Sequence, residues 1–370
     1  MANIEKKHHE PLVQIAKRDD MSGWQKWLVR FAAILIGLLV SGVISSLLTG
    51  APFAEVYSIM FKGVFGRLLE GKTTLLWRFL QQTAILLCLS LAVTPAFRMR
   101  FWNCGAEGQA LIGGLAAMVC MIEIGDAVPN GVLLIIVFFC SVLAGAIWGL
   151  IPALFQAQYK TNETLFTLMM HYVATQIVAY YVYVTGSGSG IIKPVATGNL
   201  PVVLGEKYLL NVLIVTFLMI GLYIYLQYSK HGYEISVVGE SQNTARYAGI
   251  NVKKVIIRTM AISGAICGVA GMLLVSGTDH SINTNTVGGQ GFTAIMISWL
   301  GQFNPFIMAG MAGLVTFLKT GAAKVADTFF LNSSYADIVS GIVILFLVGC
   351  EFFIQYRVKI RQFKKGGQPK

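Results

Sequence analysis

The sequence predicts an all-α, polytopic membrane protein, and three observations support that prediction. Of the 370 residues, 55% are hydrophobic and only 12% are charged, about half the charged fraction of an ordinary soluble domain. The mean hydropathy is +0.68, and most apolar residues gather in runs of about 20, the length that crosses a bilayer as a helix. With the passages given below, 20 of the 28 Lys and Arg residues fall on one side of the membrane. This asymmetry predicts that both chain ends are cytoplasmic.

The composition also excludes several classes of protein. A net charge of +11 would suggest nucleic acid as a partner of a soluble protein, but here the topology explains it, so we expect no nucleic-acid binding. The six cysteines form no CxxC pair, so neither a disulfide framework nor a zinc or other metal site is indicated. No nucleophile–base pattern stands out, and we expect neither a catalytic site nor a cofactor.

The apolar runs predict about ten passages in two inverted halves. Their approximate bounds are 31–48, 79–97, 104–124, 131–155, 164–184, 208–228, 259–277, 292–300, 306–325 and 338–356. The chain then divides into a cytoplasmic tail (1–30), a membrane-spanning domain (31–357) and a basic cytoplasmic tail (358–370). The external segment 49–78 carries apolar residues at helical spacing and is expected to lie along the membrane surface.

One match in that external segment is misleading. The stretch from Gly66 to Thr73, GRLLEGKT, fits the phosphate-binding pattern GxxxxGK[ST]. The chemistry of that pattern needs a buried strand before the loop and a helix after it, with an acidic partner for magnesium. An amphipathic segment precedes the match and it lies on the external side, so we interpret it as coincidence.

A long polar stretch, 229–258, interrupts the apolar runs and forms the central cytoplasmic loop. Ser241 is placed to cap the N-terminus of a short helix, and Gly249 is placed at the position just after its C-terminus. A helix of about two turns is marginal in water and needs something to pack on. We therefore expect a docking helix for a cytoplasmic partner, with an ordinary solvated loop as the alternative.

The eighth apolar run is too short to cross the hydrocarbon as an ordinary helix. It is either extended through its polar flanks or a half-helix. Its Gly-rich start, Gly288-Gly289-Gln290-Gly291, is similar to the start of the third run, Gly105-Ala106-Glu107-Gly108-Gln109. The two starts face the membrane from opposite sides, as expected for inverted repeats with broken helices beside a substrate path.

Polar residues near these starts are candidates for the translocation path. Glu107 is an ionisable group at a membrane end, and such groups usually face a cavity or a partner. Pairing with Arg98 or Arg100 is the alternative. Amide side chains suit a neutral polar solute. The predicted path residues are Asn103, Glu107, Gln109, Asn162, Glu163, His171 and Gln290.

Several stretches of the sequence resemble the permease subunits of bacterial ABC importers, in the branch that takes up nucleosides and simple sugars. The resemblance rests on FWNCGAEGQALIGG (101–114), TNETLFTLMMHYVA (161–174) and GYEISVVGESQNTARYAGINVKKVIIRTMAISGAICGVAG (232–271). GGQGFTAI and LGQFNP, within 288–305, agree with it. Cys104 and Phe166 depart from the residues expected at these positions in that family.

The resemblance implies a set of partners and a function. It implies a separate ATP-binding subunit, a second permease subunit (identical or related), and an external substrate-binding lipoprotein, in a bacterial plasma membrane. The helix in the central loop would then dock on the ATP-binding subunit. The implied coupling residues are Gly239, Glu240, Asn243, Ala245, Arg246, Tyr247 and Gly249.

The expected function is import of a small polar solute, with a nucleoside first and a simple sugar such as ribose second. A stand-alone proton-coupled transporter, with Glu107 and His171 as the relay, is the alternative from another class.

Overall fold

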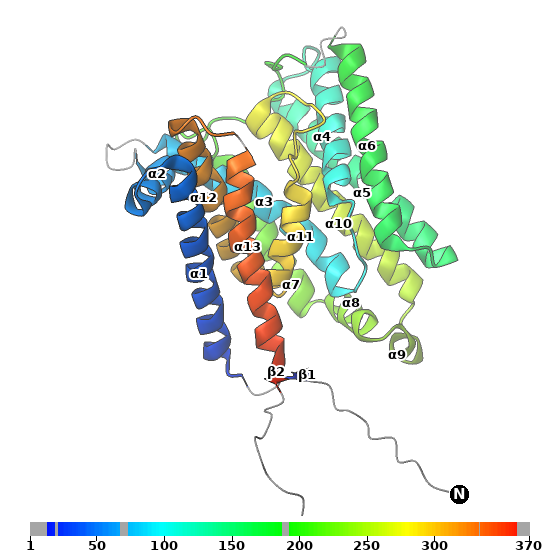
Figure 1. The fold of residues 1–370 in the computed structure, drawn as a ribbon. Helices are drawn as coiled ribbons and strands as arrows, with labels where there is room; N and C mark the ends of the chain where they lie inside the picture. The colour runs from blue at the N-terminus through cyan, green and yellow to red at the C-terminus, as the bar shows by residue number, and fades with distance from the viewer. Residues whose placement is uncertain (1–12, 19–20, 67–72, 187–191, 333, 361–370) are drawn as a thin grey trace, which may run out of the picture. The chain divides into compact units, whose positions relative to one another are not determined.

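The computed structural model describes residues 13–18, 21–66, 73–186, 192–332 and 334–360. Within these residues the fold is almost entirely helical (Figure 1). Among the described residues, nine helices are long and apolar enough to cross a membrane: α1, α3 to α7, α10, α12 and α13. The helical bounds are α1 Gly23–Thr49, α2 Phe53–Phe65, α3 Thr74–Arg98, α4 Ala106–Glu123, α5 Asn130–Tyr159, α6 Glu163–Thr185, α7 Leu209–Tyr228, α8 Lys230–Glu240, α9 Gln242–Tyr247, α10 Val252–Leu274, α11 Gln290–Leu300, α12 Pro305–Thr328 and α13 Ser334–Gln355. The all-α polytopic membrane prediction is confirmed.

Two membrane helices begin earlier in the chain than we predicted. Helix α1 begins at Gly23 rather than near residue 31, and α10 begins at Val252 rather than near residue 259. The predicted central loop also contains a helix, α8, which we did not expect. Hydropathy marks only the part of a helix in hydrocarbon, whereas these helices continue through their charged turns. In α10 that turn includes Lys253 and Lys254, whose side chains are exposed.

The chain divides into two compact units, the first formed by Met1–Met60 with Gly321–Lys370. In this unit α1 packs against α13, and the Arg30 Nε donates a hydrogen bond of 2.6 Å to the Glu351 Oε1. Arg30 is only 3% exposed, and a second polar contact joins the same two helices, in which the Tyr335 hydroxyl donates to the Ser45 hydroxyl. The ends of the unit add a departure from the all-α prediction: β1 (Val13–Lys17) pairs antiparallel with β2 (Tyr356–Ile360).

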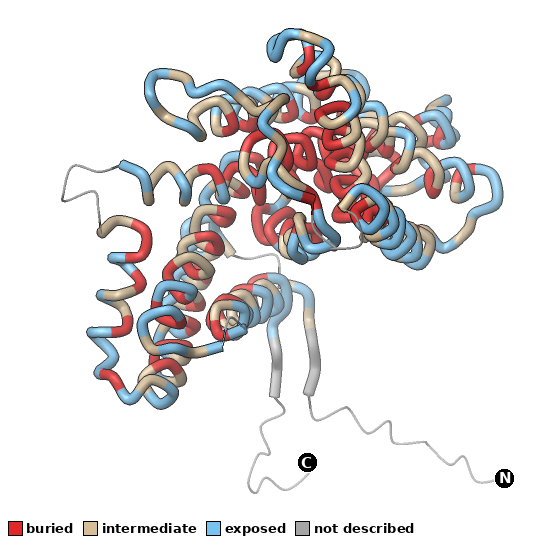
Figure 2. Tube along the Cα trace, turned by 90° about the horizontal axis from the view of Figure 1, so that it is seen from above, coloured by how far each residue is buried: buried red, intermediate tan, exposed pale blue. Residues whose placement is uncertain are grey.

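The second unit, Phe61–Thr320, is built around α3 and α10. In an apolar stretch of 18 residues, 78% of the residues of α3 and 83% of those of α10 are buried. The corresponding share is 22% in each of α5, α6 and α7. Buried residues, red in Figure 2, are accordingly concentrated inside this unit. Helix α10 has its most extensive contact with α5, where a Cβ at Gly264 would lie 2.3 Å from the Gly145 carbonyl oxygen. Small residues allow this approach, as is usual between membrane helices.

The two predicted halves interlock in a reciprocal way. Each contributes a long helix and, after a break, a second helix: α3 then α4, and α10 then α11. Helix α4 packs against α10, and α11 packs against α3. This is the arrangement that inverted repeats produce. The eighth passage is α11, whose 11 residues extend about 16 Å, so the half-helix alternative is the one that the structure has.

The region of the phosphate-binding match lacks the geometry that the motif needs. Helix α2, not a strand, leads to Gly66, and α3 begins at Thr74. Residues 67–72 of the match lie outside the described residues. The buried face of α2 carries Val56, Met60 and Val64 at a spacing of four residues, which confirms the predicted amphipathic helix.

Candidate functional site

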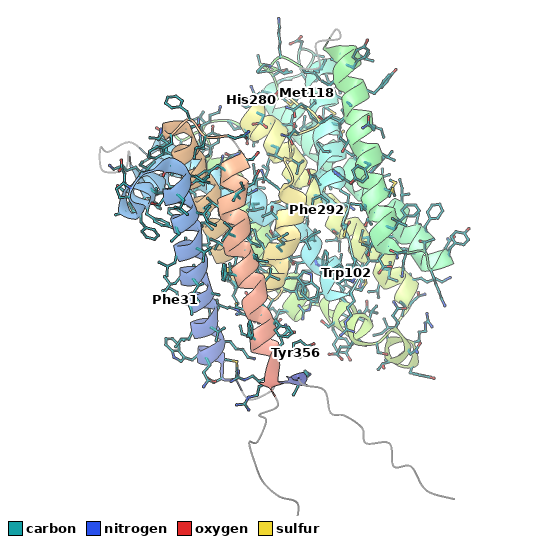
Figure 3. All side chains as sticks on the ribbon, in the orientation of Figure 1. Phe31, Trp102, Met118, His280, Phe292 and Tyr356 are labelled. Carbon is teal, nitrogen blue, oxygen red and sulfur yellow. The ribbon has the colours of Figure 1, made fainter. Side chains whose placement is uncertain are left out.

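The N-termini of α4 and α11 meet inside the second unit. Gly289, which precedes α11, donates its backbone N–H to the Glu107 Oε1 at 2.9 Å. The approach is close because α11 carries Gly291, where a Cβ would lie 2.6 Å from the Glu107 Cβ. Figure 3 shows Phe292, in the first turn of α11, between His280 and Trp102 along the height of the unit. The two Gly-rich starts noticed in the sequence are therefore one site.

Two helix N-termini lie beside the buried carboxyl group of Glu107. Glu107 is only 7% exposed and lies in the first turn of α4. Each helix N-terminus carries about half a positive charge. A hydrogen bond to a charged group stabilises by about 1.5–3 kcal/mol, which offsets part of the cost of burying this carboxyl group. No ion pair of Glu107 with Arg98 or Arg100 occurs among the described residues; Arg98 instead donates to the Leu226 carbonyl oxygen.

His171 and Gln290 complete this junction. The His171 backbone packs on α4, where a Cβ at Gly108 would lie 2.7 Å from the His171 Cα. Its ring lies 6.1 Å from the Phe292 ring, edge to face, and its Nδ1 is buried with no hydrogen-bond partner among the described residues. Gln290 is the first residue of α11. We call Glu107, His171, Gln290 and Phe292 the α4–α11 junction.

Helix α11 continues from the junction as a half-exposed aromatic stripe that we did not predict. Phe292, Met296 and Trp299 are 40%, 42% and 46% exposed and recur at helical spacing. Trp299 stacks on Trp102 with ring centroids 5.8 Å apart. The period of three to four apolar residues in α11 was visible in the sequence, but it could not show that this face is left open.

Two other predicted path residues, Asn103 and Gln109, are more fully buried than Glu107. Asn103 and Gln109 are 0% and 1% exposed and their side-chain amides bond to each other, with Asn103 Nδ2 to Gln109 Oε1 at 3.2 Å and Gln109 Nε2 to Asn103 Oδ1 at 3.1 Å. Asn103 also donates to the Ser263 hydroxyl at 3.0 Å. In this conformation both amides hold the bend before α4 against α10.

Asn162 and Glu163 lie apart from the junction, at the start of α6. Asn162 is exposed and caps the helix by accepting a hydrogen bond from the Leu165 N–H at 3.0 Å. Glu163 begins the helix, two turns before His171. The structure thus brings Glu107, His171 and Gln290 together and leaves the other four predicted path residues in two separate places.

The predicted coupling residues occupy α8, α9 and the turn that follows. Ser241 accepts a hydrogen bond from the Thr244 N–H at 3.2 Å, and Gly249 takes a positive φ of 77°. The Gly249 N–H bonds to the Arg246 carbonyl and the Ile250 N–H to the Ala245 carbonyl. This is the double C-terminal bond of a Schellman motif. Both predicted ends of the short helix are confirmed.

Helix α9 presents distinct faces. Ala245 is fully buried, whereas Tyr247 is 93% exposed and Asn243, Arg246 and Glu240 are exposed as well. Gly239, at the end of α8, packs against α3, because a Cβ there would lie 2.2 Å from the Arg98 carbonyl oxygen. The helix is thus anchored on one side and open on the other.

Comparison with known proteins gives a consistent result. A family model described as branched-chain amino acid transport system / permease component matches residues 75–348, from α3 into α13. The guanosine ABC transporter permease protein NupP of Bacillus subtilis is 29% identical, over 86% of this chain and 92% of that protein. The glucose ABC transporter permease protein TsgB13 of Haloferax volcanii is 28% identical, over 96% and 95%. The guanosine ABC transporter permease protein NupQ, also of Bacillus subtilis, is 26% identical, over 57% and 69%.

Proposed function

Because the chain belongs to the family of the branched-chain amino acid transport system / permease component, we propose that it is the permease of an importer for nucleosides. The family is one of ABC transport permeases, not of catalytic enzymes. In the proposal a separate subunit hydrolyses ATP and docks on the exposed side of α9. Membership in a family of transport-system components disfavours the stand-alone proton-coupled transporter.

The aromatic stripe of α11 is the observation that carries the proposal. A nucleobase stacks on aromatic rings, with about 1–3 kcal/mol per base in other proteins, and Phe292, Trp299 and Trp102 offer such rings half-exposed. Ribose hydroxyls need hydrogen-bonding groups, and the α4–α11 junction supplies Gln290 and His171 at one end of the stripe. We propose that the solute passes along α11, between the junction and the stacked tryptophans.

The relatives support a nucleoside before a sugar. NupP and NupQ are named for guanosine, and TsgB13 is named for glucose. A sugar ring also packs on aromatic faces, so the simple-sugar importer is the second candidate.

The proposed partners follow from the same relatives. Bacillus subtilis has two related guanosine permease proteins, which favours a second, related permease chain over an identical one. An ATP-binding subunit and an external substrate-binding lipoprotein complete the proposed assembly, in the plasma membrane of a bacterium.

Uptake of labelled guanosine tests the proposal directly. The chain is expressed with its ATP-binding subunit, partner permease and binding protein, and uptake is measured with and without excess unlabelled ribose or glucose. We expect ATP-dependent uptake that neither sugar reduces. Cells lacking only the ATP-binding subunit serve as the control. Strong competition by a sugar would move the assignment to sugar import, and uptake without the ATP-binding subunit would contradict the importer.

A further inference from the structure

A half-open pocket lies where the end of α5 meets α9 and the first turn of α10. Its volume is about 390 Å³, within the size range of small-ligand sites, and its polar lining includes Gln156, Lys160, Gln242, Arg246, Asn251 and Lys253. All of these residues belong to the second unit. Figure 1 shows α9 and the turn between α5 and α6 at the same end of this unit.

The charge of this pocket is of one sign. Lys160, Arg246 and Lys253 line it, and no Asp or Glu does. None of the three forms an ion pair within the part of the chain that the structure describes. The α5 C-terminus contributes about half a negative charge and the α10 N-terminus about half a positive charge. These contributions cancel, so the three basic side chains make the electrostatic potential of the pocket positive. Three basic side chains without an ion pair around one pocket favour an anionic ligand with several acceptor oxygens.

The length and the aromatic end of α5 lead us to expect this pocket at the level of the lipid headgroups. Helix α5 has 30 residues and is about 45 Å long, against about 30 Å of hydrocarbon. Its exposed apolar side chains continue through Leu154 and Phe155 to Tyr159. Aromatic residues at a helix end mark the membrane interface, and the pocket begins at Gln156, within the same turn.

On α9, the pocket and the Asn243–Tyr247 face are separate surfaces, and Arg246, one of the predicted coupling residues, lies on the pocket side. Gln242 and Arg246, one turn apart, line the pocket. Asn243 and Tyr247 lie about 100° further round the helix, and both are exposed without lining it. A ligand in the pocket therefore leaves the Asn243–Tyr247 face open to a protein.

We propose that this pocket binds the headgroup of an anionic phospholipid, such as phosphatidylglycerol, from the leaflet beside α9. Basic pockets between membrane helices on the cytoplasmic side are suited to anionic headgroups. The headgroup phosphate accepts hydrogen bonds from Lys160, Arg246 and Lys253, and the acyl chains lie along the exposed apolar side chains of α5. Lipid bound there ties α9 to the membrane helix α5.

Native mass spectrometry of the full-length chain in a neutral detergent tests this proposal. Phosphatidylglycerol is titrated, with phosphatidylcholine and inorganic phosphate as separate probes. We expect one saturable phosphatidylglycerol adduct and none of comparable affinity with phosphatidylcholine. The double variant Lys160→Gln/Lys253→Gln is expected to weaken that adduct at least about tenfold, since each surface cation contributes to anionic-lipid binding.

The matched control is Lys230→Gln/Lys254→Gln, which removes the same charge from exposed positions that do not line the pocket. We expect its affinity to stay within about twofold of the parent. Equal weakening by both variants would overturn the proposal in favour of general surface charge. Displacement of the lipid by inorganic phosphate at similar concentration would assign the pocket to a soluble phosphate compound, and displacement by the ATP-binding subunit would assign it to a protein; either result overturns the lipid site.

Discussion

The α4–α11 junction and the short helix α9 are held in place by opposite means. At the junction, a buried carboxylate and two glycine-rich helix starts pack so closely that one added carbon would collide with Glu107. Helix α9 is held at its ends by Ser241 and by the hydrogen bonds around Gly249, with only Ala245 buried. The difference indicates that the junction depends on tertiary contacts between distant segments, whereas α9 depends mainly on local sequence. Changes in the two regions should therefore differ in size and in kind.

The largest expected effect is that of Gly291→Ala at the junction. The new methyl group meets Glu107 at 2.6 Å, and overpacking of this kind costs about 1–3 kcal/mol. We expect a lower melting temperature of the purified protein and loss of guanosine uptake. Gly221→Ala, which meets nothing within 4 Å, is the control and should be neutral. Equal behaviour of the two variants would show that the junction is loosely packed.

The double variant Asn243→Ala/Tyr247→Ala tests the open side of α9. Both side chains are exposed, so the protein should fold and insert normally, with an unchanged amount in the membrane fraction. Co-purification of the ATP-binding subunit should be lost, because large exposed aromatics often dominate such interfaces. Tyr183→Ala, 63% exposed on α6 before substitution, is the control and should retain the subunit. Retention by the double variant would place docking elsewhere.

A third pair of variants compares the two acidic residues of the predicted path, Glu107 and Glu163. Glu107→Gln keeps the shape of the side chain and the oxygen that accepts the Gly289 hydrogen bond, but it removes the ionisable group. A hydrogen bond to a charged group stabilises by about 1 kcal/mol more than one between neutral groups. We expect the initial rate of guanosine uptake, normalised to protein amount, to fall about fivefold to tenfold. Glu163→Gln at the start of α6 should change that rate by less than about twofold. The reverse order would move the path toward α6.

The smallest expected effect is that of Ser241→Ala. Loss of an N-cap costs about 1 kcal/mol, and α9 contributes little buried surface, so the melting temperature should not change. Hydrogen exchange at the Thr244 amide should become about fivefold faster, because this amide loses its partner. Asn162→Ala removes the equivalent cap from α6, a long helix with additional packing, and exchange at Leu165 should change less. A global loss of stability in Ser241→Ala would contradict the local character of α9.

Much of the fold could be predicted from local sequence patterns, which do not depend on contacts between distant segments. The apolar runs located the membrane helices, and the shortness of the eighth run anticipated α11. Ser241 and Gly249 act within a few residues of themselves, so their roles were predictable. Charged helix ends were missed at Gly23 and Val252, because hydropathy does not distinguish a polar helical turn from a loop.

The candidate site was predicted only in part. Glu107, His171 and Gln290 were named from residue type and from the repeated glycines, but Asn103 and Gln109, of equally suitable chemistry, bond to each other instead. A polar side chain in a membrane protein can face a solute or another side chain, and the choice depends on which helix packs against it.

By itself the sequence determined the membrane helices, the broken eighth passage and the ends of α9, because hydrophobic burial in lipid and backbone capping act locally. Only the tertiary structure decided that the starts of α4 and α11 meet at Glu107, that α11 leaves an aromatic stripe open, and that Lys160, Arg246 and Lys253 surround one pocket. Those facts join residues far apart along the chain, and their positions are set by how closely glycine-bearing helices can approach one another.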